Sequence, residues 1–166
     1  MKTIDKLLSE KMMTLVRSNS QSEGQALADA IVEAGVKVIE ITLTTPGAHK
    51  IIEKLLKNKD LLVGAGTVRT VKEVKKMEDI GVSFIVSPNT NEDVIAATKK
   101  LNLVSMPGVS TPSEVAIAEE SGADILKLFP ATILGPDHLK MLREPFPGNR
   151  WCPTAGITLD SIPKWF

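Results

Sequence analysis

The chain has 166 residues, and its 20 lysines and arginines balance its 20 aspartates and glutamates, so the formal net charge is zero. A balanced charge argues against a nucleic-acid partner, because nucleic-acid-binding surfaces need a basic excess or a basic stripe. With 43% hydrophobic residues and no run of about 18 uncharged apolar residues, the chain is expected to form one globular domain over residues 1–166 with no membrane partner.

The single cysteine, Cys152, excludes an intramolecular disulfide and favours a reducing compartment, so we expect the protein in the cytoplasm. A metal site is not expected, because Cys152 and the two histidines, His49 and His138, lie far apart in the sequence and form no ligand cluster. The sequence therefore predicts no metal and no other cofactor.

Short apolar runs, each ended by glycine, proline or a polar residue, recur along the chain. They are typical of buried parallel strands and cover residues 12–17, 36–43, 60–66, 82–88, 101–108, 124–130 and 150–156. Between them, the spacing of apolar residues predicts helices, most clearly over residues 22–35, 70–81 and 111–122. Pro112 and Glu114 give the last of these helices a typical start.

Sustained alternation of strand and helix indicates either an open doubly wound sheet or a (β/α)₈ barrel. A G-x-G-x-x-G turn, which is typical of dinucleotide-binding open sheets, does not follow the first predicted strand. We therefore predict an α/β fold of the (β/α)₈ TIM-barrel type.

Side chains on a strand alternate between two faces, and in four of the predicted strands one face is apolar while the other carries a polar group. The polar groups are Arg17, Glu40, Thr67 and Lys127. In a barrel these faces converge on the interior and its carboxyl-end mouth, where active sites of this fold lie. We expect the polar groups to meet there, together with their neighbours on the same strand faces, Leu15, Val38, Thr42, Val63, Ala65, Ile125 and Phe129.

Lys127 lies inside the apolar run "ILKLF" (125–129). A lysine in a strand commonly buries its stem and extends its ammonium group to water. Here the apolar neighbours on both sides favour full burial, which lowers the pKa of a lysine and leaves its amine partly neutral. A neutral amine can attack a carbonyl group and form a Schiff base.

Glu40 is the charged residue of the run "VIEITL" (38–43). It is either one half of a buried salt bridge, with Lys127 or Arg17 as its partner, or a general acid and base whose pKa is raised by burial. The two interpretations are compatible, and the residues alone leave both open.

Two stretches are candidates for binding the anionic groups of a ligand. Arg17 offers a bidentate guanidinium to a carboxylate or phosphate, and Thr67 adds a hydroxyl beside the small residues of "GAG" (64–66). The turn "PTAG" (153–156) follows the last predicted strand, where barrels of this kind often bind phosphate with loop amides. Alternatively, "GAG" only allows close packing and "PTAG" is only a turn.

Six segments of the chain share the order and spacing of one family. They are "VIEITLTTPGA" (38–48), "VGAGTV" (63–68), "FIVSP" (84–88), "MPGVSTPSE" (106–114), "ILKLFPA" (125–131) and "CPTAGI" (152–157). With these segments the chain resembles the bacterial 2-keto-3-deoxy-6-phosphogluconate (KDPG) and 4-hydroxy-2-oxoglutarate (KHG) aldolases. The resemblance implies a metal-free class I aldolase on a (β/α)₈ barrel, and a homotrimer.

The resemblance also assigns roles to individual residues. It implies that Lys127 forms the Schiff base, that Glu40 is the acid and base catalyst, and that Thr67 helps to hold the substrate carboxylate. The expected phosphate- and substrate-binding residues are Thr154, Ala155, Gly156, Phe129 and Pro88.

The chain departs from the family pattern in three places. Thr44 stands where many members have an arginine that binds the substrate carboxylate; we hypothesise that Arg17 supplies this guanidinium and keep Thr44 among the carboxylate-binding candidates. Ala155 replaces the first glycine of the usual "PTGG", which would strain a turn that needs a positive φ. The eighth strand of the family barrel is expected to be missing, so the barrel over residues 1–166 is predicted to be C-terminally incomplete.

The predicted reaction is the cleavage of KDPG to pyruvate and glyceraldehyde 3-phosphate, a step of the Entner-Doudoroff pathway, or of KHG to pyruvate and glyoxylate. The expected partner is therefore a small keto acid or sugar phosphate. Two alternatives stay open. One is another phosphate-binding barrel enzyme that uses Glu40 and Lys127 without a covalent intermediate, and the other is a non-catalytic or truncated barrel that only binds sugar phosphates.

Overall fold

Helices and strands alternate along the chain, of which the computed structural model describes residues 2–165. The helices are α1 (Thr3–Glu10), α2 (Gln21–Glu33), α3 (Ala48–Leu55), α4 (Val71–Ile80), α5 (Glu92–Lys100), α6 (Pro112–Glu120), α7 (Ala131–Arg143) and the 3₁₀ helix η1 (Leu159–Trp165). The strands are β1 (Thr14–Val16), β2 (Val38–Thr42), β3 (Leu62–Gly66), β4 (Phe84–Val86), β5 (Val104–Met106), β6 (Gly108–Val109), β7 (Leu126–Leu128) and β8 (Trp151–Pro153). Each predicted segment overlaps an observed element of its type, so the α/β class is confirmed.

All paired strands run parallel and form two sheets, in the orders β1-β2-β3-β4-β5 and β6-β7-β8. Only Pro107 separates β5 from β6, so residues 104–109 pair with β4 on one side and with β7 on the other. The backbone N–H of Lys127 donates to the Pro107 carbonyl at 2.9 Å, which joins the two sheets at this point. The parallel sheet is thus confirmed, while the closed (β/α)₈ barrel and the missing eighth strand stay predictions.

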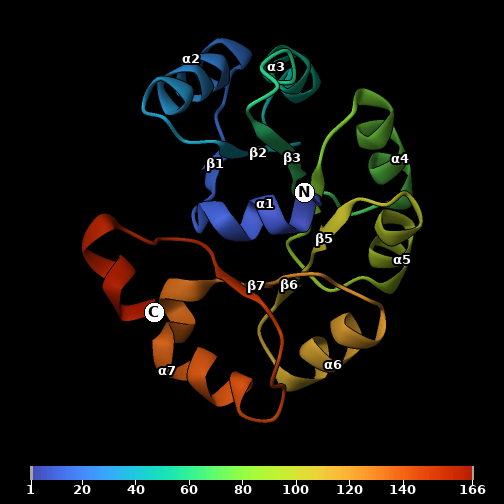
Figure 1. Cartoon of the computed structure of the whole chain (residues 1–166), viewed down its shortest axis with the longest axis vertical. Coiled ribbons are helices and arrows are strands. Elements are labelled where there is room, and N and C mark those ends of the chain that lie inside the picture. The colour runs from blue at the N-terminus through green and yellow to red at the C-terminus, as the bar shows by residue number, and fades with distance from the viewer. Residues whose placement is uncertain (1, 166) are drawn as a thin grey trace.

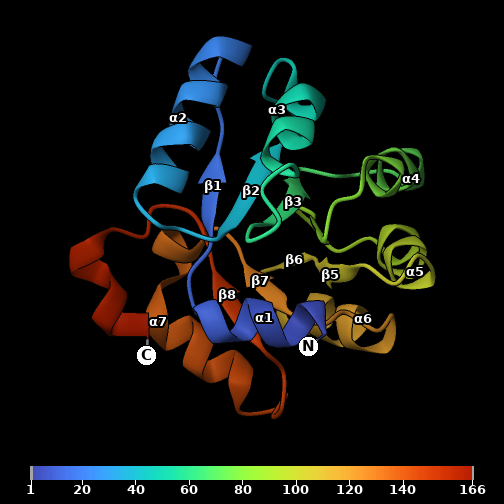
Figure 2. The same cartoon turned by 45° about the horizontal axis from the view of Figure 1, so that its top comes forward.

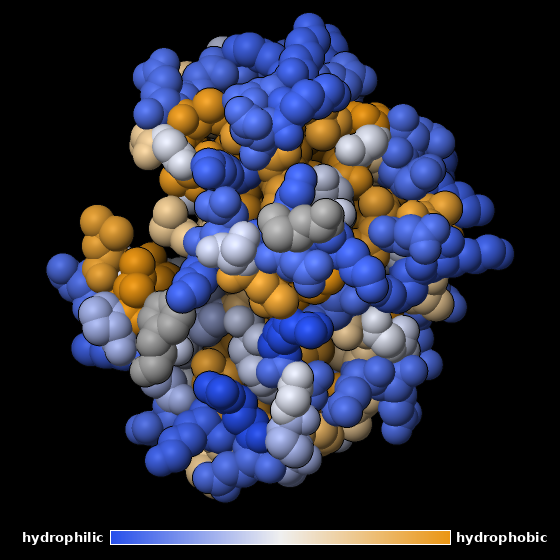
Figure 3. Space-filling model, viewed as in Figure 1, coloured by the Kyte–Doolittle hydropathy of each residue, from blue (hydrophilic) through white to orange (hydrophobic). Residues whose placement is uncertain are grey.

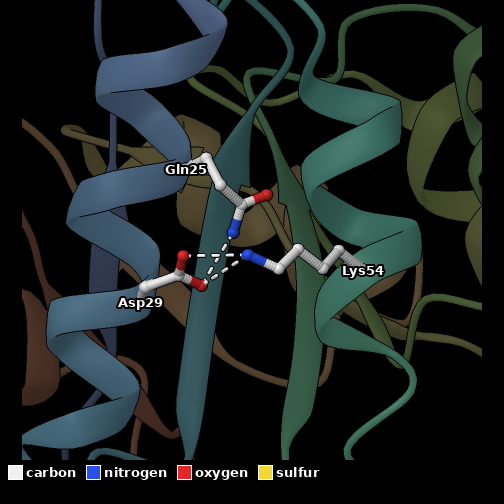
Figure 4. A network of polar contacts seen from close by, with 3 residues as sticks. All are labelled: Gln25, Asp29 and Lys54. Carbon is white, nitrogen blue, oxygen red and sulfur yellow. Dashed lines mark hydrogen bonds and ion pairs between the residues drawn. The ribbon is translucent and has the colours of Figure 1, made fainter.

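The strands lie at the centre of the molecule, and helices α2 to α7 surround them (Figures 1 and 2). Polar contacts tie neighbouring helices on this outer side. Asp29 on α2 accepts hydrogen bonds from Gln25 at 2.8 Å and from Lys54 on α3 at 2.9 Å (Figure 4). The bond from Lys54 lowers the pKa of the Asp29 carboxyl.

The start of α6 follows the sequence prediction. Thr111 accepts a hydrogen bond from the N–H of Glu114, whose carboxylate accepts one from the N–H of Thr111, and Pro112 occupies the first turn. This reciprocal capping satisfies two backbone donors that a helix would otherwise leave unpaired.

An apolar core fills the space between the strands and the outer helices. It joins Ile39, Ile41, Val63, Ala65 and Ile85 of the strands to Ala28, Ile51, Ile52, Val74 and Met77 of the helices. Burial of each large side chain among these stabilises the fold by about 1.5–3 kcal/mol. The expectation that Val63 and Ala65 face the interior is therefore wrong. Strand β3 ends at Gly66, and Thr67 has a φ of +58°, so the alternation assumed for Thr67 does not continue through it.

A second apolar cluster fills the inner side of the strands. It joins Leu7 from α1 to Val38, Phe84, Val104 and Ile125 at or just before the amino ends of their strands, and it extends to Val86 and Met106, the last residues of β4 and β5. Because Val38, Phe84 and Val104 are the first residues of their strands, α1 covers the amino ends, and it crosses the centre of Figure 1. We call this cluster the amino-end plug. The residues on the inner strand faces toward the carboxyl ends form the candidate site.

Candidate active site

Lys127 lies at the middle of β7, on the inner side of the strands, and its side chain is 4% exposed. Its neighbours Leu126 and Leu128 pack outward into an apolar core with α6 and α7. Among residues 2–165, the Lys127 amine forms no hydrogen bond or ion pair, and it lies 5.2 Å from the centre of the Phe129 ring. The structure thus confirms the burial of this lysine.

Glu40 occupies the middle of β2 and is fully buried. Neither oxygen of its carboxyl group has a hydrogen-bond partner among the described residues. Burial raises the pKa of Glu40, and the charges of Lys127 and Arg17 lower it in part. No ion pair joins Glu40 to either cation within residues 2–165, so the salt-bridge interpretation does not hold. A buried carboxyl group with a raised pKa and no partner is typical of a catalytic site.

The "GAG" motif makes room for two side chains on the inner side. A Cβ atom at Gly64 would overlap the ring of Phe84 in the amino-end plug. A Cβ atom at Gly66 would overlap the carboxyl group of Glu40, which leans from β2 across the neighbouring strand. These glycines therefore shape the interior rather than the contact between strand and helix.

Cys152 belongs to the same interior and was not assigned a role from the sequence. It pairs with Lys127 in the β7–β8 register, packs against the amino-end plug, and lies 3.8 Å from the Thr154 hydroxyl. Burial raises the pKa of its thiol, the contact with Thr154 acts in the opposite direction, and the charges of Glu40 and Lys127 raise and lower it to a smaller extent. A raised pKa favours the neutral thiol over the thiolate nucleophile. The alternation that links Cys152 to Thr154 in the predicted strand 150–156 was the available signal.

Arg17 and Thr67 meet at the carboxyl ends of β1 and β3. The guanidinium of Arg17 is exposed, and its Nη2 donates to the Thr67 hydroxyl at 3.2 Å. Thr44, which follows β2, is also exposed, and its hydroxyl donates to that of Thr42 at 3.2 Å. The structure thus brings Arg17 and Thr67 together next to Glu40, as the sequence predicts, and turns Thr44 toward Thr42.

The turn Thr154–Gly156 follows β8 and lies against the start of α7. The carbonyls of Thr154 and Ala155 accept hydrogen bonds from Ala131 and Thr132 at 2.8 and 3.3 Å. The N–H groups of Ala155 and Gly156 donate to no acceptor within the described part of the chain. Ala155 has a φ of +86° and Gly156 one of +71°, which confirms that the position of the alanine needs a positive φ.

Two further candidates border this end of the strands. Phe129 is half-buried after β7, with its ring near the Lys127 amine. Pro88 is half-buried after β4, and its carbonyl lies so close to Gly108 on β6 that a Cβ atom there would overlap it.

No group of three or more His, Cys, Asp or Glu side chains within residues 2–165 is arranged to hold a metal ion. In the same part of the chain, no helix is both long and apolar enough to cross a membrane.

The arrangement offers an amine, a proton acceptor and an anion receptor close together toward the carboxyl ends of the strands. The amine of Lys127 can attack a carbonyl group, the carboxyl of Glu40 can move protons, and Arg17 with Thr67 can hold a carboxylate at the mouth. Such a combination fits covalent chemistry on a keto acid.

Known proteins share both the sequence and the fold of this chain. The family model for KDPG and KHG aldolase matches residues 3–166. The 2-dehydro-3-deoxy-phosphogluconate aldolase of Pseudomonas aeruginosa is 32% identical over 162 residues, which cover 96% of this chain and 74% of the relative. The crystal structure of the 2-keto-3-deoxy-6-phosphogluconate aldolase of Zymomonas mobilis with 3-phosphoglycerate is 31% identical, with a TM-score of 0.88 and coverage of 98% of this chain and 78% of that one.

A further solved structure bears on the chemistry. It is the KDPG aldolase of Legionella pneumophila with pyruvate captured at low pH as a covalent carbinolamine intermediate. It is 30% identical to this chain, has a TM-score of 0.80, and is matched over 92% of this chain and 74% of its own length.

Proposed function

The chain belongs to the family of KDPG and KHG aldolases, and from this membership we infer that it is a class I aldolase that works through a lysine Schiff base. It is a carbon–carbon lyase that cleaves KDPG to pyruvate and glyceraldehyde 3-phosphate, or KHG to pyruvate and glyoxylate. The observation that carries this function in the chain itself is that Lys127 and Glu40 are both buried, that the Glu40 carboxyl has no hydrogen-bond partner among the described residues, and that the charge of Lys127 reaches it. The carbinolamine trapped in the Legionella pneumophila relative supports the covalent route.

We propose the following roles for the pair. The amine of Lys127 adds to the C2 ketone of the substrate, and Glu40 moves protons while the carbinolamine loses water and becomes an iminium ion. Glu40, through a water molecule, then accepts the proton of the C4 hydroxyl, and the C3–C4 bond breaks. The electron pair of that bond passes into the iminium, which becomes an enamine, and the aldehyde leaves. Protonation of the enamine at C3 and hydrolysis release pyruvate and restore Lys127.

The substrate carboxylate is proposed to bind at the mouth, to the guanidinium of Arg17 and the hydroxyl of Thr67. Their hydrogen bond spans the carboxyl ends of β1 and β3, on either side of the β2 strand that carries Glu40, and the charge of Arg17 reaches Glu40. Thr44 stays in the proposed carboxylate site because its hydroxyl lies at the same end of β2. In this chain Arg17 takes the place of the arginine that many family members have at the position of Thr44.

The phosphate of the substrate is proposed to bind at the turn Thr154–Gly156, because the N–H groups of Ala155 and Gly156 are free to donate to it within the described residues. Phe129, whose ring lies near Lys127, and Pro88, which follows β4, are proposed to contact the bound substrate as well. The Zymomonas mobilis relative, whose structure holds 3-phosphoglycerate, supports a phosphorylated substrate.

We also propose the assembly and setting of the enzyme. Its strands and helices make up a single (β/α)₈-type barrel domain, and three copies form a homotrimer in the cytoplasm. Two side chains favour an interface, since Ile133 on α7 and Leu159 at the start of η1 are 82% and 84% exposed. An apolar patch lies over η1 at the left edge of Figure 3. Light scattering coupled to size-exclusion chromatography would measure the number of copies.

Trapping with pyruvate tests the function directly. The protein is incubated with pyruvate, reduced with borohydride and digested, and the modified peptide is identified by mass spectrometry. We expect an adduct on Lys127 and none on the other lysines, and no adduct in Lys127→Arg. Cleavage without any adduct would indicate a non-covalent enzyme. Thermal stabilisation by the ligand without cleavage would indicate a binding protein.

A further inference from the structure

A chain of buried hydroxyl groups lies beneath the loop that carries Arg17. The Thr42 hydroxyl, at the end of β2, donates to the carbonyl of Val16 at 3.1 Å and lies 3.1 Å from the Thr45 hydroxyl. The Thr45 hydroxyl in turn accepts the backbone N–H of Ser18 at 3.3 Å. The backbone of Val16 is therefore hydrogen-bonded to Thr42 at the end of β2, and the backbone of Ser18 to Thr45 just after it. Arg17 lies between these two anchored residues.

The groups at the two ends of this hydrogen-bond network, the Val16 carbonyl and the Ser18 N–H, determine which hydroxyl donates to which. A carbonyl can only accept, so the single proton of the Thr42 hydroxyl is committed to Val16. The Thr45 hydroxyl must then donate to Thr42, and its lone pair is free for the N–H of Ser18. The Thr44 hydroxyl also donates to Thr42, at 3.2 Å, so the Thr42 oxygen accepts from two threonines while its proton goes to Val16.

Three residues of this hydrogen-bond network are shielded from water. Thr42 is 0% exposed, Thr45 2% and Ser18 8%. Helix α2 seals the group from above, because a Cβ atom at Gly24 would crowd the hydroxyl of Ser18 and the methyl group of Thr45. A buried network with all donors paired is rigid, since breaking one bond leaves a polar group without a partner.

We propose that Thr42 and Thr45 are positioning residues that fix the backbone on both sides of Arg17 and so aim its guanidinium at the substrate carboxylate. The side chain of Arg17 needs such support, because it is exposed and has one hydrogen bond within the described residues, to Thr67 at 3.2 Å. This inference rests on the proposed function, in which Arg17 binds the carboxylate.

Removal of the Thr45 hydroxyl tests the proposal. Thr45→Val keeps the shape of the side chain, and we expect it to raise the KM for the keto-acid substrate about fivefold to tenfold while kcat changes less than about twofold. Thr45→Ser keeps the hydroxyl and should stay near the original KM. Thr45→Ala, which removes the hydroxyl without adding bulk, should behave as Thr45→Val and serves if that variant does not fold.

The decisive comparison uses a second background. If Thr45 acts through Arg17, Thr45→Val should leave the KM of Arg17→Ala unchanged within about 1.5-fold. A merely structural role would raise the KM by the same factor in both backgrounds and would overturn the proposal. Thr98→Val is the matched control, because it removes an equally buried threonine hydroxyl from α5, where it donates to Val94 at 2.7 Å. It should lower stability and leave KM unchanged.

A structural readout keeps this inference separate from the function itself. If the original protein neither cleaves substrate nor traps pyruvate, the proposed function is wrong, and crystal structures then decide the positioning role alone. In Thr45→Val, the Arg17 guanidinium should leave the Thr67 hydroxyl. An unchanged Arg17–Thr67 contact in that variant would contradict the inference whatever the activity.

Discussion

The two ends of the inner strand faces differ in kind, although only two residues separate them. On β2, Val38 packs into the amino-end plug, while the Glu40 carboxyl has no hydrogen-bond partner among residues 2–165. On β7 the same step leads from Ile125, just before the strand, to Lys127. All four side chains are buried, so burial alone does not distinguish them. The amino end contributes stability, while the carboxyl end holds polar groups whose burial without partners opposes folding.

Lys127→Met should give the largest effect and tests the carboxyl end. We expect cleavage to fall about 10⁴-fold or more and the pyruvate adduct to disappear, because the nucleophile is lost. The free energy of unfolding should stay the same or rise, since an apolar side chain replaces a buried amine without a partner. Urea denaturation and steady-state kinetics measure the two. Lys99→Met, which breaks the contact with Asp124, is the control that should lose stability and keep activity.

Phe84→Ala tests the opposite end. Phe84 is fully buried over Gly64, so its truncation should lower the free energy of unfolding by about 3–5 kcal/mol. The folded protein should still form the pyruvate adduct on Lys127. Urea denaturation and borohydride trapping on the same sample measure both properties. A folded variant that forms no adduct would show that the plug also shapes the pocket.

Glu40→Gln sharpens the comparison through pH. We expect kcat to fall about 10²- to 10³-fold, because the amide cannot move protons. Burial raises the pKa of Glu40 in the folded state, so the folded protein holds this proton more tightly than the unfolded chain. The associated stability is therefore fully present below the pKa of the unfolded chain and is lost as the pH rises through the folded pKa. Relative to the original protein, Glu40→Gln should gain stability as the pH rises, measured by urea denaturation across pH. A difference that does not vary with pH would contradict the raised pKa.

Ala155→Gly should give the smallest effect. Glycine adopts a φ of +86° without the strain that alanine carries there, so the free energy of unfolding should rise by about 1 kcal/mol. If the turn binds phosphate, the KM for KDPG should fall while the KM for the unphosphorylated KHG stays the same. Thermal unfolding and kinetics with the two substrates measure these changes. Equal shifts in both KM values would argue against a phosphate contact.

Local pattern was sufficient for most of the fold and for the two central residues of the site. Apolar runs ended by Gly or Pro located the strands, and the charges of Glu40 and Lys127 inside such runs indicated their burial. Arg17 and Thr67 were also expected to meet, and the structure joins them by a hydrogen bond, although the strand alternation used to place Thr67 does not hold.

The parts that the sequence did not predict depend on contacts between strands. Thr67 does not follow the alternation of strand side chains because its backbone has a positive φ, a conformation that the presence of a threonine does not predict. The roles of Gly64 and Gly66 follow from the side chains of Phe84 and Glu40 on neighbouring strands. Cys152 lies beside Lys127 because of the register between β7 and β8, which the sequence does not specify. Each of these depends on which strands are neighbours and in what register.

The overlap between Glu40 and a side chain at position 66 has an evolutionary consequence. A side chain at position 66 would enter the volume that the Glu40 carboxyl occupies, so an alanine there would have to displace this carboxyl group. Selection for catalysis by Glu40 is therefore expected to act as selection for glycine at 66 as well.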